Sequence, residues 1–147
     1  MLKESLAAAF GVLGIGVLFN IRGKNLFFSC VGGGISWLFY KLFMSFGVST
    51  IPALFFASII ISAYSEICAR KFKTPVTVFL TGSLIPLVPG GAMYYTMYEA
   101  IQGDPYNTWS MILTTLGSAA ILAFGVIVVS TVIKVIKFLK ENKRLRV

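Results

Sequence analysis

The chain alternates long apolar runs with short polar or glycine-containing segments. Each run approaches the ~20 apolar residues that a helix needs to cross a bilayer. The runs cover residues 5–21, 26–46, 51–68, 75–101 and 109–133. This pattern predicts an all-α integral membrane protein with about five transmembrane helices, which form a single transmembrane domain over residues 1–147.

The fourth run cannot be one continuous helix. Pro86 and Pro89 each lack a backbone donor and clash with the preceding turn, and Gly90 and Gly91 follow them. The two halves of the run, residues 75–85 and 90–101, would be helices of about 16 and 18 Å, which together cover a ~30 Å hydrocarbon core. We therefore expect one crossing, broken at Pro86–Gly91, as in transporters whose broken helices surround a substrate site.

Composition narrows the class of protein. Hydrophobic residues make up 57% of the chain and charged residues 12%, whereas soluble domains carry about 25% charged residues. The chain has no histidine, which removes histidine-based triads and zinc sites. No nucleophile–base pair, phosphate-binding loop or metal-ligand cluster stands out, so we expect no enzyme, cofactor or metal. Cys30 and Cys68 are predicted to be packing residues.

Charge predicts the orientation in the membrane. The net charge is +8, but the basic residues lie at the ends of apolar runs, which indicates topology determinants and not a nucleic-acid surface. Basic residues occur at 22–24, at 70–73 and in the tail 134–147, and none occur at 47–50 or 102–108. This alternation predicts a plasma-membrane protein (the inner membrane of a bacterium) with its N-terminus outside and a cytoplasmic basic tail. The recurrence of Lys134, Lys137 and Lys140 predicts that this tail is a helix that emerges along the lipid surface. A re-entrant fourth segment would place that tail outside.

The break is the strongest candidate for a ligand site. The second half-helix begins near Gly90, so its unpaired N–H groups and positive dipole end favour an anionic group such as a carboxylate. Nearby hydroxyl and phenol groups would complete the site. The candidates for substrate binding or for a hinge are Thr81, Ser83, Pro86, Pro89, Gly90, Gly91, Tyr94 and Tyr95. The alternative is a structural kink whose free backbone groups are satisfied by neighbouring helices.

A few charged residues are candidates for coupling transport to protons. Glu66 lies near the cytoplasmic end of the third run, and Arg70 follows four residues later on the same helical face. A local ion pair and a proton- or substrate-coupled carboxylate both explain this spacing. Glu99 would lie near the external end of the second half-helix, as a gating residue or an ordinary interfacial acid. Glu4 is predicted to be solvated, and Lys41 to extend to the interface.

Residues 66–104 carry a more specific signal. They contain A-R-x-x-K-T-P, followed by I-P-L-V-P-G-G. This stretch resembles the threonine/serine exporter family, in particular its smaller, C-terminal-type half. The positions that match the family element are Glu66, Arg70, Pro75, Pro86, Pro89, Gly90 and Gly91.

The resemblance implies a function and a partner. In that family the two halves occur fused in one chain or as separate membrane subunits, and this chain resembles the separate small subunit. A larger membrane subunit of the same family is the implied partner. Proton-driven export of threonine or serine is the implied activity, with export of dicarboxylates such as succinate as the alternative.

Two further interpretations stay open. The chain could be an accessory subunit whose partner holds the whole pathway, or a homo-oligomeric channel that needs neither a partner nor a proton gradient.

An odd number of crossings would also insert two fused halves in opposite orientations, which suggests an inverted repeat. A C-terminus located outside the cell would contradict that hypothesis.

Overall fold

The protein is built from helices alone in the part of the chain that the structure describes. The computed structural model describes residues 1–144, so residues 145–147 of the predicted basic tail lie outside the described residues. The elements, in order, are α1 (Leu2–Leu18), α2 (Lys24–Ser45), α3 (Thr50–Phe72), α4 (Val76–Leu84), the short 3₁₀ helix η1 (Ile85–Leu87), α5 (Gly90–Gln102) and α6 (Pro105–Arg144). The prediction of an all-α fold is confirmed.

Three helices are long and apolar enough to span a membrane. They are α2, α3 and the stretch Pro105–Leu139 of α6. The bent pair Val76–Leu87 and Gly90–Gln102, which meet at 52°, gives a fourth span if the pair crosses as one. Helix α1 has 17 residues, or about 25 Å of helix, which is less than a ~30 Å hydrocarbon core. The predicted count of about five crossings is not confirmed.

Helix α6 is longer than the fifth apolar run. It begins at Pro105 and continues without interruption to Arg144 over 40 residues. The prediction gave a span over 109–133 and a helical basic tail, and residues 134–144 continue the same helix without a break. Lys, Arg, Leu and Glu, which supply seven of these eleven residues, are good helix formers, and neither proline nor glycine interrupts the stretch.

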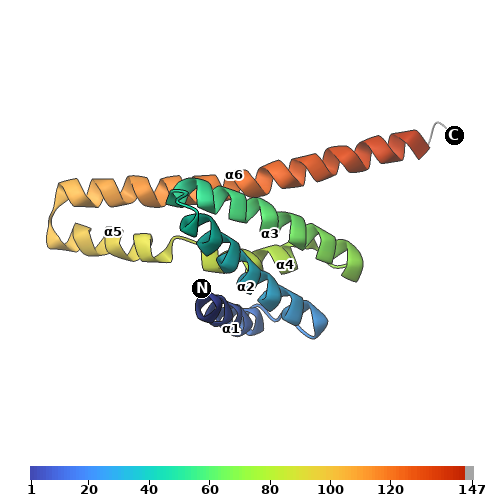
Figure 1. Cartoon of the computed structure of the whole chain (residues 1–147), viewed down its shortest axis with the longest axis horizontal. Helices are drawn as coiled ribbons and strands as arrows, with labels where there is room; N and C mark the ends of the chain where they lie inside the picture. The colour runs from blue at the N-terminus through green and yellow to red at the C-terminus, as the bar shows by residue number, and fades with distance from the viewer. Residues whose placement is uncertain (145–147) are drawn as a thin grey trace.

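The core lies among α2, α3 and α4, where small residues let the helices approach closely (Figure 1). One buried cluster joins Leu54, Ala57 and Ile61 of α3 to Leu87 of η1 and Leu122 of α6. Such close approach by glycine and serine is the usual way in which membrane helices pack. The close contacts place Gly32 against Ser83, Gly33 against Val12, Gly82 against Ser29 and Gly125 against Ser58.

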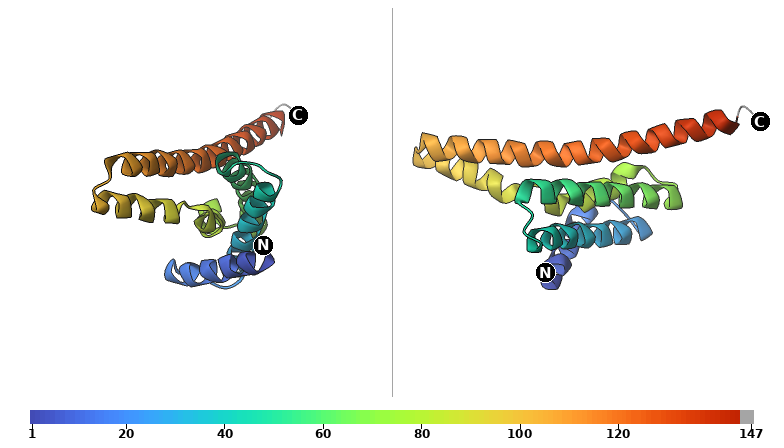
Figure 2. Two further views of the ribbon diagram at one scale, coloured as in Figure 1. Left: turned by 60° about the vertical axis from the view of Figure 1, so that its left-hand side comes forward. Right: turned by 45° about the horizontal axis from the view of Figure 1, so that its top comes forward.

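Helices α3 and α6 run parallel to each other. The ring of Phe55 stacks on that of Phe124 with centroids 5.9 Å apart, and Glu66 lines a cavity together with Lys134. The right-hand view in Figure 2 shows the two helices running side by side. Because α3 and α6 point the same way, the intervening chain, α4 to α5, must return from one end of the bundle to the other.

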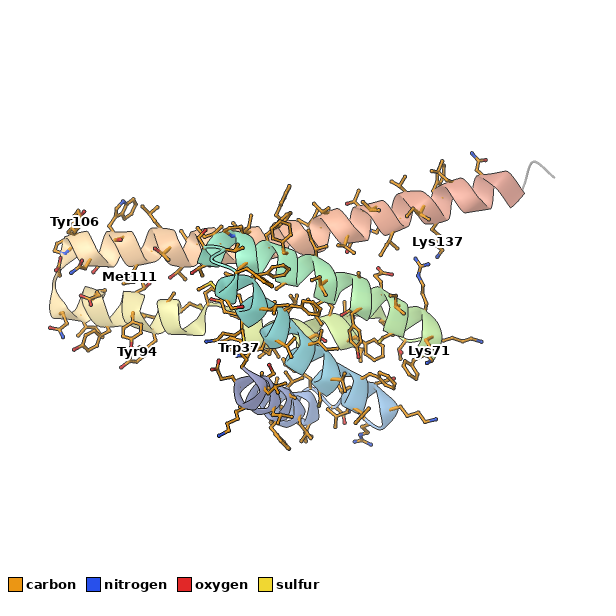
Figure 3. All side chains as sticks on the ribbon, viewed as in Figure 1. Trp37, Lys71, Tyr94, Tyr106, Met111 and Lys137 are labelled. Carbon is orange, nitrogen blue, oxygen red and sulfur yellow. The ribbon has the colours of Figure 1, made fainter. Side chains whose placement is uncertain are left out.

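The basic residues between the helices gather at one end of the bundle. The turn before α2 meets the end of α3 there, since Phe28 packs on Phe72 with ring centroids 4.6 Å apart. Figure 3 shows Lys71 and Lys137 at this end and Tyr106 at the other. We call it the basic end; its described members are Arg22, Lys24, Arg70, Lys71, Lys73, Lys134 and Lys137.

Helix α5 and the first part of α6 form a hairpin that extends beyond the other helices (Figure 1). Gly103 closes the turn in the left-handed region at φ 77°, a conformation that glycine adopts without strain. Asp104 then caps α6, because its Oδ1 accepts the N–H groups of Tyr106 and Asn107 at 3.1 and 3.2 Å. Helix α5 has no buried residue.

Candidate functional site

The helix break lies where the sequence analysis expects it. After η1, Val88 turns extended and Pro89 becomes the N-cap of α5, without a side-chain cap. The Gly90 N–H donates to the Val88 carbonyl at 2.7 Å, and the Met93 N–H donates to the Pro89 carbonyl at 3.0 Å. Between them, the N–H groups of Gly91 and Ala92 have no backbone acceptor within the described chain. The start of α5 therefore presents two free donors, as helix N-termini do.

The two sides of the break differ in packing. Leu87, the last residue of η1, is 2% exposed and lies in the core cluster with Leu122. In contrast, a side chain added at Gly90 or Gly91 would meet no atom within 4 Å. The break is thus anchored on its α4 side and open on its α5 side.

The predicted binding residues do not share one pocket. Ser83 is fully buried beside Gly32, and its hydroxyl has no hydrogen-bond partner among the described residues. Thr81 is exposed on the same helix. Tyr94 and Tyr95 are 65% and 55% exposed on α5, and Figure 3 shows Tyr94 on the hairpin.

Tyr94 belongs instead to a groove between α5 and α6. The groove has a volume of about 490 Å³, and its lining residues are Met93, Tyr94, Thr96, Met97, Ile112, Thr115 and Leu116. Thr96 and Thr115 hold the two helices together there through their hydroxyls, 3.2 Å apart. Pro86 lines a different cavity, so Tyr94 and Pro86 face different spaces.

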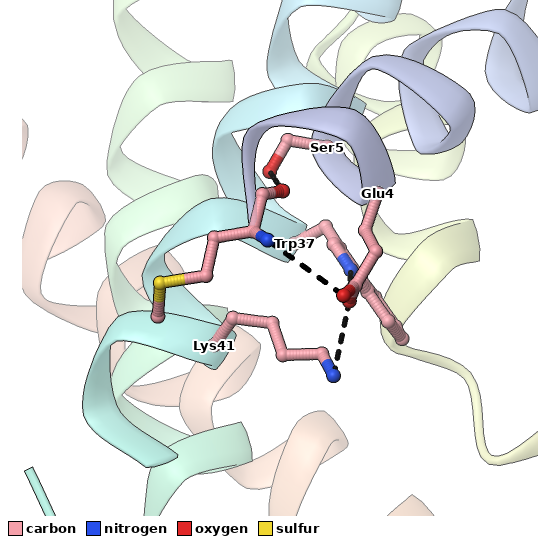
Figure 4. Close-up of polar contacts among 5 residues, drawn as sticks. Glu4, Ser5, Trp37 and Lys41 are labelled. Carbon is pink, nitrogen blue, oxygen red and sulfur yellow. Dashed lines mark hydrogen bonds and ion pairs between the residues drawn. The ribbon is translucent and has the colours of Figure 1, made fainter. Parts of the chain in front are cut away.

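The cavity beside Pro86 contains a charge cluster that the sequence analysis missed. Its volume is about 370 Å³, and Glu4, Ala7, Ala8 and Trp37 complete its lining. Figure 4 shows the Glu4 carboxylate between Trp37 and Lys41. Oε2 of Glu4 lies 3.0 Å from Nζ of Lys41 and accepts the indole N–H of Trp37 at 3.2 Å. The sequence offered one signal for this cluster, the spacing of Trp37 and Lys41 by one helical turn.

The predicted coupling residues lie at two separate places. Glu66 pairs locally with Arg70, with Oε2 3.8 Å from Nε. This pair borders a cavity of about 500 Å³ at the basic end, which Lys134 and Lys137 of α6 also line. Glu99 lies on α5, and no described basic group is within ion-pairing distance of it.

The described residues include no group of three histidine, cysteine, aspartate or glutamate side chains that could hold a metal ion. Cys30 and Cys68 are both buried and unpaired.

Comparison with known proteins identifies a family and a distant relative. The model of the family described as "Threonine/Serine exporter, ThrE" matches residues 4–132. An uncharacterized protein of Haemophilus influenzae is 22% identical over 102 residues, which are 69% of this chain and 34% of that protein. The chain thus spans about a third of the length of this relative. No solved structure matches the chain.

Proposed function

The chain belongs to the threonine/serine exporter family, and from this premise we propose that it is a subunit of a secondary exporter of small carboxylated metabolites, with threonine and serine as its first substrates. Family membership and the apolar helices make it a multi-pass membrane protein of transporter type. The substrate, the partner and the site are parts of the proposal.

The observation that carries the proposal is the position of the open break. Leu87, next to the break, packs on Leu122. Leu122 lies near the middle of the apolar run over 109–133, with about 20 Å of helix on one side and about 17 Å on the other. Free N–H groups at this depth are costly in lipid unless a cavity or a polar ligand satisfies them. A substrate carboxylate would satisfy those of Gly91 and Ala92.

The parallel packing of α3 and α6 supports a single crossing by α4–η1–α5. A re-entrant loop would return the chain to the basic end, and α6 would then run antiparallel to α3. In a single crossing, the basic end faces the cytoplasm by the positive-inside rule, with the C-terminus on that side. A reporter fused after residue 147 should therefore be active only in the cytoplasm, and an external signal would contradict this orientation.

We assign the partner role to a larger subunit of the same family. Helix α5 packs mainly on α6. Along it, Tyr94, Met97 and Ile101 are 65%, 70% and 87% exposed. A second subunit on this side would enclose the open half of the break. The exposed tyrosines would then become walls of the pathway, and Thr81 would face the partner or lipid.

Export of dicarboxylates is the second candidate, and a non-transporting accessory role is the third. Both carboxylate classes suit the start of α5, so that helix end does not distinguish them. The candidates for proton coupling remain the Glu66–Arg70 pair and Glu99, because each lies near one end of the proposed pathway.

Reconstitution tests this proposal. Proteoliposomes would hold this chain alone, the co-purifying larger subunit alone, or both, and efflux of threonine, serine and succinate would be measured with and without a pH gradient. We expect threonine and serine efflux only with both subunits and a gradient. Efflux of succinate alone would favour the second candidate. Full activity of the partner alone would establish the accessory role.

A further inference from the structure

In the cluster beside Pro86, an ammonium group pairs with a carboxylate and also lies near the face of an aromatic ring. Nζ of Lys41 lies 3.0 Å from Oε2 of Glu4 and 5.6 Å from the centroid of the Trp37 ring, within cation–π range. The indole N–H of Trp37 orients the same carboxylate, and the Met1 amino group lies 3.7 Å from Oε1. A carboxylate with an indole face beside it is a suitable receptor for a small ammonium ion.

Although Lys41 lies in the last turns of α2, which ends at Ser45, the cluster is level with the apolar middle of α6. Phe43 of α2 packs on Phe56 of the antiparallel α3, with ring centroids 5.6 Å apart, so Lys41 is level with Ser58. Ser58 in turn contacts Gly125 of α6. Along α6, Gly125 is about 13 Å from Lys134 and about 24 Å from Trp109. Charged groups at such a depth are expensive in lipid and generally mark a pathway or a binding site.

The cluster is also open. The side chains of Glu4 and Lys41 are 48% and 35% exposed, and Glu4 borders the cavity of about 370 Å³ that Trp37 and Pro86 also line. A half-exposed carboxylate at membrane depth must face water or another polypeptide, because lipid would not solvate it. The cavity therefore lies beside the break and is accessible to a polar solute.

We propose that Glu4 and Trp37 form the ammonium subsite for an exported amino acid, and that Lys41 occupies this subsite when no substrate is bound. The inference rests on the proposed function. On binding, the α-ammonium of the substrate replaces the Lys41 ammonium on Glu4, so one cation is exchanged for another. A dicarboxylate has no ammonium group to make this exchange, and Glu4 repels it. The cluster thus selects amino acids over dicarboxylates.

Direct binding measurements test this exchange. The chain would be purified with its co-purifying subunits, and radiolabelled threonine binding would be measured for the wild type, Glu4→Gln, Lys41→Met and the control Lys3→Gln. Lys3 is exposed one residue before Glu4 and forms no ion pair within the described chain. Glu4→Gln should weaken binding by about tenfold or more, because a charged contact is lost. Lys41→Met should bind at least about threefold more tightly, because the internal competitor is gone.

Competition with unlabelled compounds identifies the recognised group. In the wild type, serine should displace threonine, whereas N-acetylthreonine and succinate, which lack the ammonium group, should not. Equal weakening by Glu4→Gln and Lys41→Met would mean that the pair only fastens α1 to α2, and would overturn the inference. Binding by Lys41→Met no tighter than that of the wild type, or by Glu4→Gln equal to it, would also overturn it.

The result for the wild type distinguishes a failure of the ammonium subsite from a failure of the exporter function. A wild-type complex that binds threonine, with a Glu4→Gln variant that binds it equally well, contradicts the ammonium subsite and leaves the exporter function standing. A wild-type complex that neither binds nor transports threonine or serine contradicts the proposed function, and the ammonium subsite with it.

Discussion

The α2–α3–α4 bundle and the α5–α6 hairpin are both apolar, yet the bundle is closely packed and the hairpin is largely exposed. Nine residues of α3 are buried, including Ala57, Ser58 and Ile61, whereas α5 has none. In the bundle, glycine and serine bring the helices into contact. In the hairpin, the surface carries Met93, Met97 and three tyrosines, which face outward.

This difference shows that apolar character alone does not mark the packed region of a membrane protein. Helices that are apolar on every side have no amphipathic period to indicate their buried face. Small residues mark it instead, because they allow close backbone approach. The break at Val88–Pro89 separates the bundle, whose helices pack on one another within the chain, from the hairpin, whose apolar surface must be covered by lipid or a partner.

Replacing an aromatic side chain with alanine should give the largest difference in stability loss between the bundle and the hairpin. Phe79 of α4 is fully buried against Cys68 and Ala69, so Phe79→Ala should lower the free energy of unfolding by about 3–5 kcal/mol. Tyr94→Ala, on the exposed hairpin, should change it by less than about 1 kcal/mol. Thermal unfolding of the purified protein in detergent measures both. Equal losses would mean that the hairpin is packed as tightly as the bundle.

Replacing glycine with leucine should also destabilise the bundle more than the hairpin, by a smaller margin. The side chain of Gly33→Leu would collide with Val12, with Pro86 close behind at 3.6 Å, and should cost about 3 kcal/mol. Gly117→Leu on α6 is the control, because a Cβ there meets no atom within 4 Å. It should stay within about 0.5 kcal/mol of the wild type in the same assay. A tolerated Gly33→Leu would contradict the close packing of α1 on α2.

The smallest effect should come from the basic end. The guanidinium side chain of Arg70 is 60% exposed beside Glu66, and exposed ion pairs contribute about 0.5 kcal/mol or less. Arg70→Gln should therefore leave thermal unfolding nearly unchanged. If export falls while stability holds, the pair serves coupling; if both hold, it is an ordinary helix-end pair.

Much of the fold follows from the sequence, because helix ends are set locally. The break at Pro86–Gly91 was predictable, since proline cannot continue a hydrogen-bonded helix. The turn at Gly103–Asp104 follows from the conformational freedom of glycine and the capping by Asp104. A helical tail was predicted from the recurrence of its lysines, whereas its place in one unbroken helix with the preceding span was not stated, because charged residues were taken as the end of the span.

The candidate site was harder to predict, because its contacts are distant in sequence. Glu4 and Trp37 are 33 residues apart, and no periodicity connects a residue at the start of one apolar helix with the side of the next. The opposite orientations of Ser83 and Thr81, two residues apart on α4, likewise depend on which face of α4 meets α2. Only the packing of the whole bundle determines that face.

The central claim is that the break is the transport site, and efflux from two variants of it tests this claim most directly. Pro89→Ala restores a backbone donor at the break, and Gly90→Leu adds a side chain to its open side. Each variant would be expressed with its partner, and membrane insertion would be measured beside threonine efflux. The account predicts normal insertion with export abolished in both. Wild-type efflux from either variant would contradict it.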